Sequence, residues 1–162
     1  MQDSSAPSSS NTRAAVERLV GLYEHFTPDH LAQLGNHYAP DARFKDPFND
    51  VRGVPGIAQV FAHMFATLER PRFVVTEQLV QGDQAFLAWD FHFRMRRWRP
   101  DVDQCIHGAT LVRFDARGRV LLHRDYWDTA EELYEKLPVF GTLMRWLRRT
   151  ASATAKTPRA HP

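Results

Sequence analysis

The sequence predicts an α+β domain in which a curved antiparallel sheet wraps around helices. Three segments before residue 70 repeat apolar side chains at three- and four-residue steps, which is typical of helices that bury one face. A run of β-branched and aromatic segments follows, separated by short turn sequences, which is typical of strands joined as hairpins. Helical spacing returns after the last of these strands, so a terminal helix completes the predicted fold.

The helical half can be read from its boundary residues. The first helix is predicted to begin at Thr12, after a Ser-rich segment, residues 1–11, that we expect to be disordered. Pro28 suits the first turn of a second helix. A short strand is predicted over residues 42–46, and a Gly-Pro-Gly turn at residues 53–56 precedes the third helix.

The strand-rich half follows. Its strands are predicted over residues 73–81, 85–97, 104–114 and 119–128. Gly82 and Asp83 have the composition of a hairpin turn between the first two. The pattern of a capping box at residues 129–132 predicts that the terminal helix starts there. We therefore expect one domain over residues 12–149, followed by a disordered basic tail over residues 150–162.

Composition limits the classes of function. A chain of 162 residues, 43% of them hydrophobic, fits one domain with a proper core. No acidic residue follows residue 144, so the earlier part of the chain holds all 19 acidic residues and is mildly acidic, which argues against nucleic-acid binding. The single cysteine, Cys105, excludes an internal disulfide and fits a reducing compartment. With no segment typical of a signal peptide or membrane span, we expect a cytoplasmic protein.

The last predicted strand carries an unusual face. Side chains alternate across a strand, so His123, Asp125 and Trp127 share one face. Imidazole, carboxylate and indole groups together are uncommon in a plain core. This face is therefore either solvated or part of a pocket.

The strand predicted over residues 85–97 has two faces of opposite character. One carries Asp90 and His92, and the other carries Trp89, Phe91 and Phe93. From amphipathicity alone, the aromatic face is core and the Asp/His face meets water. In a second interpretation the Asp/His face lines a pocket, and a second subunit covers the aromatic face.

Two motifs resemble those of a known superfamily. Residues 38–48 read Tyr-Ala-Pro-Asp-Ala-Arg-Phe-Lys-Asp-Pro-Phe, and residues 123–128 read His-Arg-Asp-Tyr-Trp-Asp. With the helix after Gly53, these motifs resemble the superfamily named for nuclear transport factor two, also called SnoaL-like, over roughly residues 12–137. The resemblance implies a cone-shaped apolar pocket between the concave face of the sheet and three helices, commonly in a homodimer. It favours the second interpretation, with the homodimer formed through the face of Trp89, Phe91 and Phe93.

Two branches of the superfamily suggest roles for acidic residues. Beside the ketosteroid isomerases, Asp46 matches the general base, while the two oxyanion-hole positions fall near Leu19 and at Thr110. Beside the limonene epoxide hydrolases, Asp90 and Asp125 match two carboxylates that activate water, and Ala88 stands where that family has an arginine.

The resemblance implies a set of residues that converge in the cone. The hypothesis is that Asp90 and Asp125, tuned by His92 and His123, perform acid/base chemistry on a small hydrophobic molecule, with Asp46 as a further candidate. The expected pocket lining is Tyr23, Phe44, Phe61, Phe65, Phe86, Thr110 and Trp127. Such chemistry needs no cofactor, and the histidine spacing does not support a metal site. The alternative is a cone that binds a ligand or a protein partner without catalysis.

Some of these residues also have ordinary structural explanations. Asp46, before Pro47, is equally suited to forming a turn. The segment of residues 140–149 is basic and amphipathic, and we favour a role in closing the mouth of the cone over contact with an anionic membrane. The sequence therefore leaves open whether the protein is an enzyme.

Overall fold

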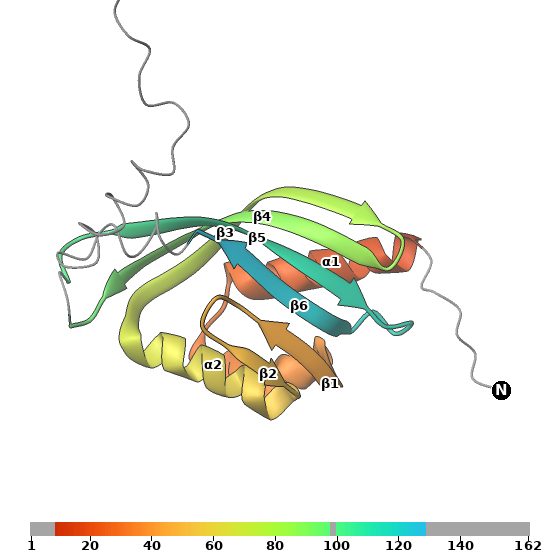
Figure 1. Cartoon of the computed structure of the whole chain (residues 1–162), viewed down its shortest axis with the longest axis horizontal. Helices are drawn as coiled ribbons and strands as arrows, with labels where there is room; N and C mark the ends of the chain where they lie inside the picture. Colours follow the sequence, from red (N-terminus) through yellow and green to blue (C-terminus); the bar gives the residue numbers. More distant parts are fainter. Residues whose placement is uncertain (1–8, 98–99, 129–162) are drawn as a thin grey trace, which may run out of the picture. The chain divides into compact units, whose positions relative to one another are not determined.

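The computed structural model describes residues 9–97 and 100–128, and Figure 1 shows their arrangement. Their elements are α1 (Ser9–Glu24), the 3₁₀ helix η1 (Pro28–Asn36), β1 (Tyr38–Lys45), β2 (Asp50–Arg52), α2 (Val54–Thr67), β3 (Leu68–Gln81), β4 (Gln84–Met95), β5 (Gln104–Phe114) and β6 (Val120–Trp127). All of these elements lie in one compact unit. The predicted terminal helix and the basic tail lie outside the described residues. No helix within the described ranges is long and apolar enough to cross a membrane.

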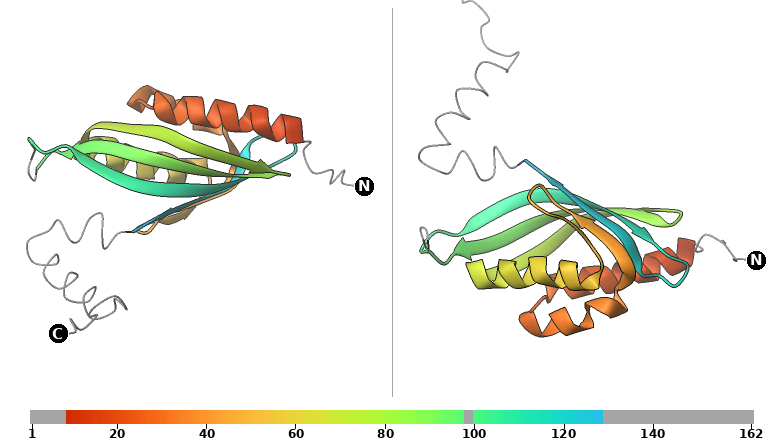
Figure 2. Two further views of the ribbon diagram at one scale, coloured as in Figure 1. Left: turned by 90° about the horizontal axis from the view of Figure 1, so that it is seen from above. Right: turned by 60° about the horizontal axis from the view of Figure 1, so that its bottom comes forward.

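The six strands form one sheet in the order β2-β1-β6-β5-β4-β3. Neighbouring strands are antiparallel except for β1 and β6, which run parallel. Figure 2 shows the sheet curving around the helices, with α1 and α2 on its concave side. The predicted fold class, a curved sheet wrapped around N-terminal helices, is confirmed.

Irregular pairing in β3 helps to bend the sheet. The strand starts at Leu68, directly after α2 and earlier than predicted. Its register against β4 shifts around Pro71, which has no N–H group to donate, and shifts again before Glu77. Arg70, beside Pro71, has a φ of 50°. Because bulges bend a strand and increase its twist, these irregularities curve β3.

The hydrophobic core lies between the helices and the concave face of the sheet. Its largest fully buried apolar side chains include Val16, Leu19, Leu34, Tyr38, Phe44, Ile57, Val112, Phe114 and Val120. A second cluster contains Trp89, Phe91 and Phe93 on β4, packed against Met64 of α2 and Phe73 of β3. The aromatic face of β4 is therefore covered by elements of the same chain.

This arrangement decides between the two interpretations of β4. Trp89, Phe91 and Phe93 are only 6–9% exposed, so the prediction that a second subunit covers them is wrong for this face. Asp90 and His92 alternate with these rings and lie on the opposite, convex face, so the prediction that they line the cone is also wrong. Amphipathicity alone gives the correct orientation, because residues of α2 and β3 supply apolar cover. The homodimer itself stays a prediction.

Gly108 is required by the close approach of an indole ring. It lies directly opposite Trp89, and a Cβ at residue 108 would lie 2.6 Å from Cζ2 and 2.7 Å from Cζ3 of that ring. We expect Gly108→Ala to lower the free energy of unfolding by about 1–3 kcal/mol, because the ring is held in a packed core. Urea unfolding followed by circular dichroism measures the change.

Gly21 offers a matched control. It lies within α1, and a Cβ there meets no atom within 4 Å. Gly21→Ala should therefore stabilise the protein by roughly 0.5–1 kcal/mol, because alanine loses less conformational freedom than glycine in a helix. Equal stability of the two variants would contradict the packing of Trp89 over Gly108.

Candidate active site

A small pocket opens between the helices and the concave face of the sheet. Its lining residues are Tyr23, Phe61, Phe73, Val75, Leu87, Trp89, Thr110, His123 and Asp125. They come from α1, α2 and the four strands β3 to β6. The cavity has a volume of about 30 Å³, enough for one or two water molecules. Most of its wall is apolar, and its polar groups are concentrated on a few side chains.

The register of the strands allows Trp89, Thr110 and Asp125 to form consecutive hydrogen bonds. Thr110 on β5 pairs with Leu87 of β4 on one side and with Asp125 of β6 on the other, so these residues share the concave face. The indole Nε1 of Trp89 donates to Thr110 Oγ1 at 2.8 Å, and the threonine hydroxyl donates to Asp125 Oδ1 at 2.5 Å. The carboxylate thus receives a hydrogen bond from a threonine that is itself held in place.

A second series of hydrogen bonds reaches the same carboxylate from the opposite direction. The hydroxyl of Tyr23 is hydrogen-bonded to that of Tyr38, and Tyr38 lies 2.9 Å from His123 Nδ1. His123 Nε2 lies 2.9 Å from Asp125 Oδ1. Because a carboxylate only accepts, Nε2 carries the proton and donates, which leaves Nδ1 to accept from Tyr38 in the neutral imidazole.

The packing around His123 fixes its ring. The side chain is only 5% exposed. The ring of Phe44 lies with its centroid 4.7 Å from the imidazole, and Tyr38 stacks on it at 6.1 Å. A ring held on its faces and at both nitrogens has little freedom to rotate, so the direction of its hydrogen bonds is set by the fold.

The two tyrosines stay protonated at neutral pH. Burial raises the pKa of Tyr23 well above its ordinary value of 10.0, and the nearby Tyr38 and Asp125 raise it further. Burial also raises the pKa of Tyr38, although its hydrogen bond with Tyr23 acts in the opposite direction. Charged oxygen is disfavoured where water is excluded. Both hydroxyls are therefore available as hydrogen-bond donors.

The structure brings together five of the residues selected from the sequence. Tyr23, Phe61, Thr110, His123 and Asp125 all line the pocket. The alternation predicted for the last strand is thus matched by the positions of His123 and Asp125. Their chemical roles stay predictions.

Other aromatic candidates lie around the pocket or away from it. Phe44 is buried beneath His123, and Phe65 packs on Phe26 in the core. Trp127 contacts Phe48 in the loop after β1. Phe86 is 43% exposed on the convex face, so the prediction that it lines the pocket is wrong. Like Asp90, it alternates along β4 with the side chains that face the core.

Asp46 organises the loop between β1 and β2. Its Oδ1 accepts from the backbone N–H of Phe48 at 2.7 Å and of Asn49 at 2.6 Å, and Oδ2 accepts from the amide of Asn49 at 2.9 Å. Asp46 is not among the residues that line the pocket. These contacts support the turn-forming role, while its role as a general base stays a prediction.

Sequence reasoning missed several residues in and around the pocket. Tyr38 begins the motif over residues 38–48, yet its link to His123 depends on the parallel pairing of β1 and β6, which the local pattern does not reveal. The amphipathicity of its strand, taken alone, would have placed Trp89 on the core side of the sheet, where it lines the pocket. The position of the isomerase tyrosine falls near Leu19, whereas the tyrosine of α1 that lines the pocket is Tyr23, one turn later, which was already selected from the sequence.

The fold and the site together define a class of protein: an α+β domain whose curved sheet and helices enclose an apolar pocket. A family model described as a SnoaL-like domain matches residues 19–123, which is more than half of the chain. The protein therefore belongs to the SnoaL-like domain family. A search of curated proteins gave no significant match.

Solved structures show the same fold. A protein with a ketosteroid isomerase-like fold from Catenulispora acidiphila, in complex with trimethylamine, is 18% identical, with a TM-score of 0.63 over 74% of this chain and 88% of that one. An NTF2-like protein from Burkholderia pseudomallei is 20% identical, with a TM-score of 0.63 over 75% of this chain and 93% of that one. An epoxide hydrolase of M. tuberculosis, described as LEH-like, is 14% identical, with a TM-score of 0.63 over 91% of this chain and 99% of that one.

Proposed function

We propose that the protein is an acid/base enzyme that binds a small hydrophobic molecule in this pocket and uses Asp125 as the general base. One observation carries the proposal. Two hydrogen-bond series, one through Thr110 and one through His123, end on the same carboxylate oxygen, Oδ1, at the wall of an apolar cavity. A carboxylate held by two donors is well positioned to exchange a proton with a bound molecule.

The second oxygen of the carboxylate is the proposed base. Both hydrogen bonds that described residues make to Asp125 reach Oδ1, and the side chain is 15% exposed. Oδ2 would take a proton from a C–H group next to a carbonyl or from a water molecule. The two donors at Oδ1 keep the carboxylate in one orientation throughout.

The tyrosine pair supplies the complementary donor. Tyr23 lines the pocket, and its hydroxyl stays protonated because it is buried. Rotated away from Tyr38, it would donate to an oxygen of the substrate that gains negative charge in the transition state. This arrangement supports an isomerase, cyclase or hydrolase type of reaction. Among the structural neighbours, one is described as a putative isomerase and another as an epoxide hydrolase.

The size of the cavity limits how a substrate enters. A volume of about 30 Å³ is far below the roughly 300 Å³ or more of a typical small-molecule site, so lining side chains must rotate to admit a ligand. Its walls of Phe61, Phe73 and Leu87 favour an apolar body. The same volume suits a single water molecule beside Asp125, as a hydrolytic step requires.

The test is a panel of apolar ketones, enones and epoxides incubated with the full-length protein in D₂O. Proton abstraction predicts deuterium at the carbon next to the carbonyl, and hydrolysis predicts diols from epoxides; NMR and mass spectrometry detect both. Tryptophan fluorescence reports binding separately, because Trp89 lines the pocket. Compounds that bind but undergo neither reaction would contradict the proposal.

That outcome would support the second candidate, a pocket that binds a ligand without catalysis. One observation favours this candidate: no buried side-chain nitrogen or oxygen atom among the described residues lacks a hydrogen-bond partner. The series of Tyr23, Tyr38, His123 and Asp125 would then serve to satisfy polar groups in the core.

A further inference from the structure

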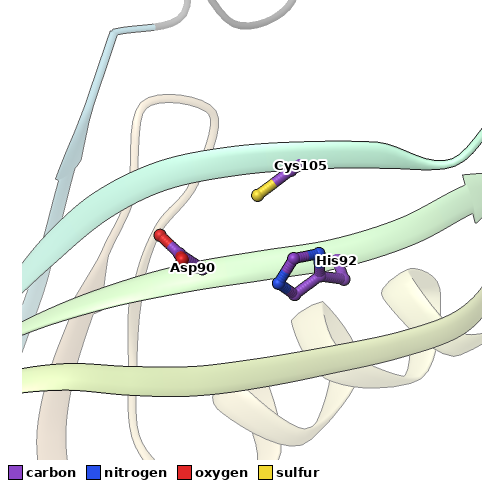
Figure 3. Close-up of side chains that lie close together, drawn as sticks. All are labelled: Asp90, His92 and Cys105. Atoms are coloured by element: carbon purple, nitrogen blue, oxygen red, sulfur yellow. The ribbon is translucent and has the colours of Figure 1, made fainter.

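The convex face of the sheet carries a compact group of different donor atoms. Asp90 and His92 stand two residues apart on β4, and Cys105 lies on β5 directly opposite His92. Figure 3 shows the three side chains side by side on the same face. One donor atom from each lies within 4.8 Å of the others. All three residues are partly buried, and they lie on the other side of β4 from Trp89 and the pocket.

These donors match the preferences of one class of metal ion. A thiolate, an imidazole nitrogen and a carboxylate oxygen are the ligands of zinc and related divalent transition metals, whereas magnesium and calcium prefer oxygen alone. Ligand atoms around a tetrahedral zinc ion are about 3.5 Å apart, given bond lengths of roughly 2.0–2.3 Å. Donors within 4.8 Å therefore need only small side-chain rotations to close on an ion.

The surroundings hold the three donors in place. The hydrogen-bonded ladder between β4 and β5 fixes the backbone positions of all three residues. His107, opposite Asp90, has its Nδ1 2.6 Å from Asp90 Oδ1, which orients the carboxylate and leaves Oδ2 for an ion. Outer hydrogen bonds of this kind position the ligands of metal sites. A divalent ion would also balance the two negative charges of the thiolate and the carboxylate.

We propose that Asp90, His92 and Cys105 bind a divalent transition-metal ion of the zinc class, with water completing the coordination and His107 as a positioning residue. The site is separate from the acid/base pocket and does not depend on the proposed activity. By bridging β4 and β5 it stabilises the part of the sheet whose opposite face forms the pocket wall.

The experiment is a titration of the metal-free full-length protein with Co²⁺, followed by absorption spectroscopy and competition with Zn²⁺. We expect one equivalent to bind, with a thiolate-to-cobalt charge-transfer band and the intense visible bands of tetrahedral cobalt, and Zn²⁺ to remove both. Cys105 is the only cysteine in the chain, so the charge-transfer band reports this site alone. Thermal unfolding should shift to higher temperature with Zn²⁺, because the ion binds the folded state.

Four variants and a control make the result specific. Cys105→Ser should remove the charge-transfer band, and Asp90→Asn and His92→Ala should each weaken Co²⁺ binding at least about tenfold. His107→Ala should retain the band with affinity lowered by about 10- to 100-fold, as expected for an outer partner. His63→Ala, an exposed histidine on α2, should leave the titration unchanged. A band that survives both Asp90→Asn and His92→Ala, or cobalt binding without a thiolate band, would overturn the proposal.

Discussion

Asp125→Asn should lower the rate of the proposed reaction by about 10²- to 10⁴-fold, the usual contribution of a positioned general base. Asparagine has nearly the same shape and can keep an amide oxygen toward Thr110 and His123, so the two hydrogen bonds at Oδ1 are retained. The amide cannot accept a proton from substrate. The measurement is the rate of deuterium exchange or diol formation with a compound identified in the screen, together with its dissociation constant.

Asp41→Asn is the matched control for that experiment. Asp41 is an exposed carboxylate on β1, so its loss should leave both rate and affinity unchanged. We expect Asp125→Asn to change the dissociation constant by much less than the rate, because the substrate body contacts apolar walls. An Asp125→Asn protein that is folded, binds the compound and reacts at the wild-type rate would exclude Asp125 as the base.

Local alternation predicted the part of the site that depends on one strand. The spacing of His123, Asp125 and Trp127 places them on one face of β6 whatever the neighbouring strands do. Tyr23 and Phe61 could likewise be selected because each belongs to the apolar stripe of a helix. Periodicity within one element is encoded locally, which is why these predictions agree with the structure.

Whether candidate residues on different strands share one face depends on register, which is a property of pairs of strands. Asp90 and Asp125 were expected to converge in the cone. Asp125 is instead aligned with Thr110 and, through it, with Leu87, which is three residues from Asp90 and therefore on the other face of β4. A shift of one residue exchanges the two faces of a strand, so analogy with relatives could not replace the register. The amphipathic pattern of β4 indicated the correct orientation, because its rings need apolar cover and residues of α2 and β3 provide it.

The same consideration explains why the metal cluster could not be predicted. His92 and Cys105 are far apart in sequence, and only the antiparallel pairing of β4 with β5 makes them direct neighbours. Sequence spacing identifies ligands that lie on one helix or in one loop. It does not identify ligands that face each other across two strands.

The free energy of unfolding should fall steeply above about pH 10, because two buried tyrosines keep their protons in the folded protein. Burial raises the pKa of both Tyr23 and Tyr38 above the value of 10.0 for an exposed tyrosine. Above that pH the unfolded chain loses these protons while the folded chain retains them. The stabilisation is fully present below about pH 10 and is lost as pH rises toward the folded pKa values, with a slope of up to about 1.4 kcal/mol per pH unit for each tyrosine.

Tyrosine variants separate this effect from other alkaline titrations. Tyr23→Phe and Tyr38→Phe should each reduce the slope by up to about 1.4 kcal/mol per pH unit, measured by urea unfolding between about pH 9 and 11.5. Tyr126→Phe should leave the slope unchanged, because Tyr126 is 44% exposed in the folded protein. The slope is the informative quantity, since removing a buried hydroxyl also lowers stability at every pH. Equal slopes for all three variants and the wild type would show that water reaches the tyrosine pair. A tyrosine pair open to water could not hold His123 in the tautomer that the proposed mechanism requires.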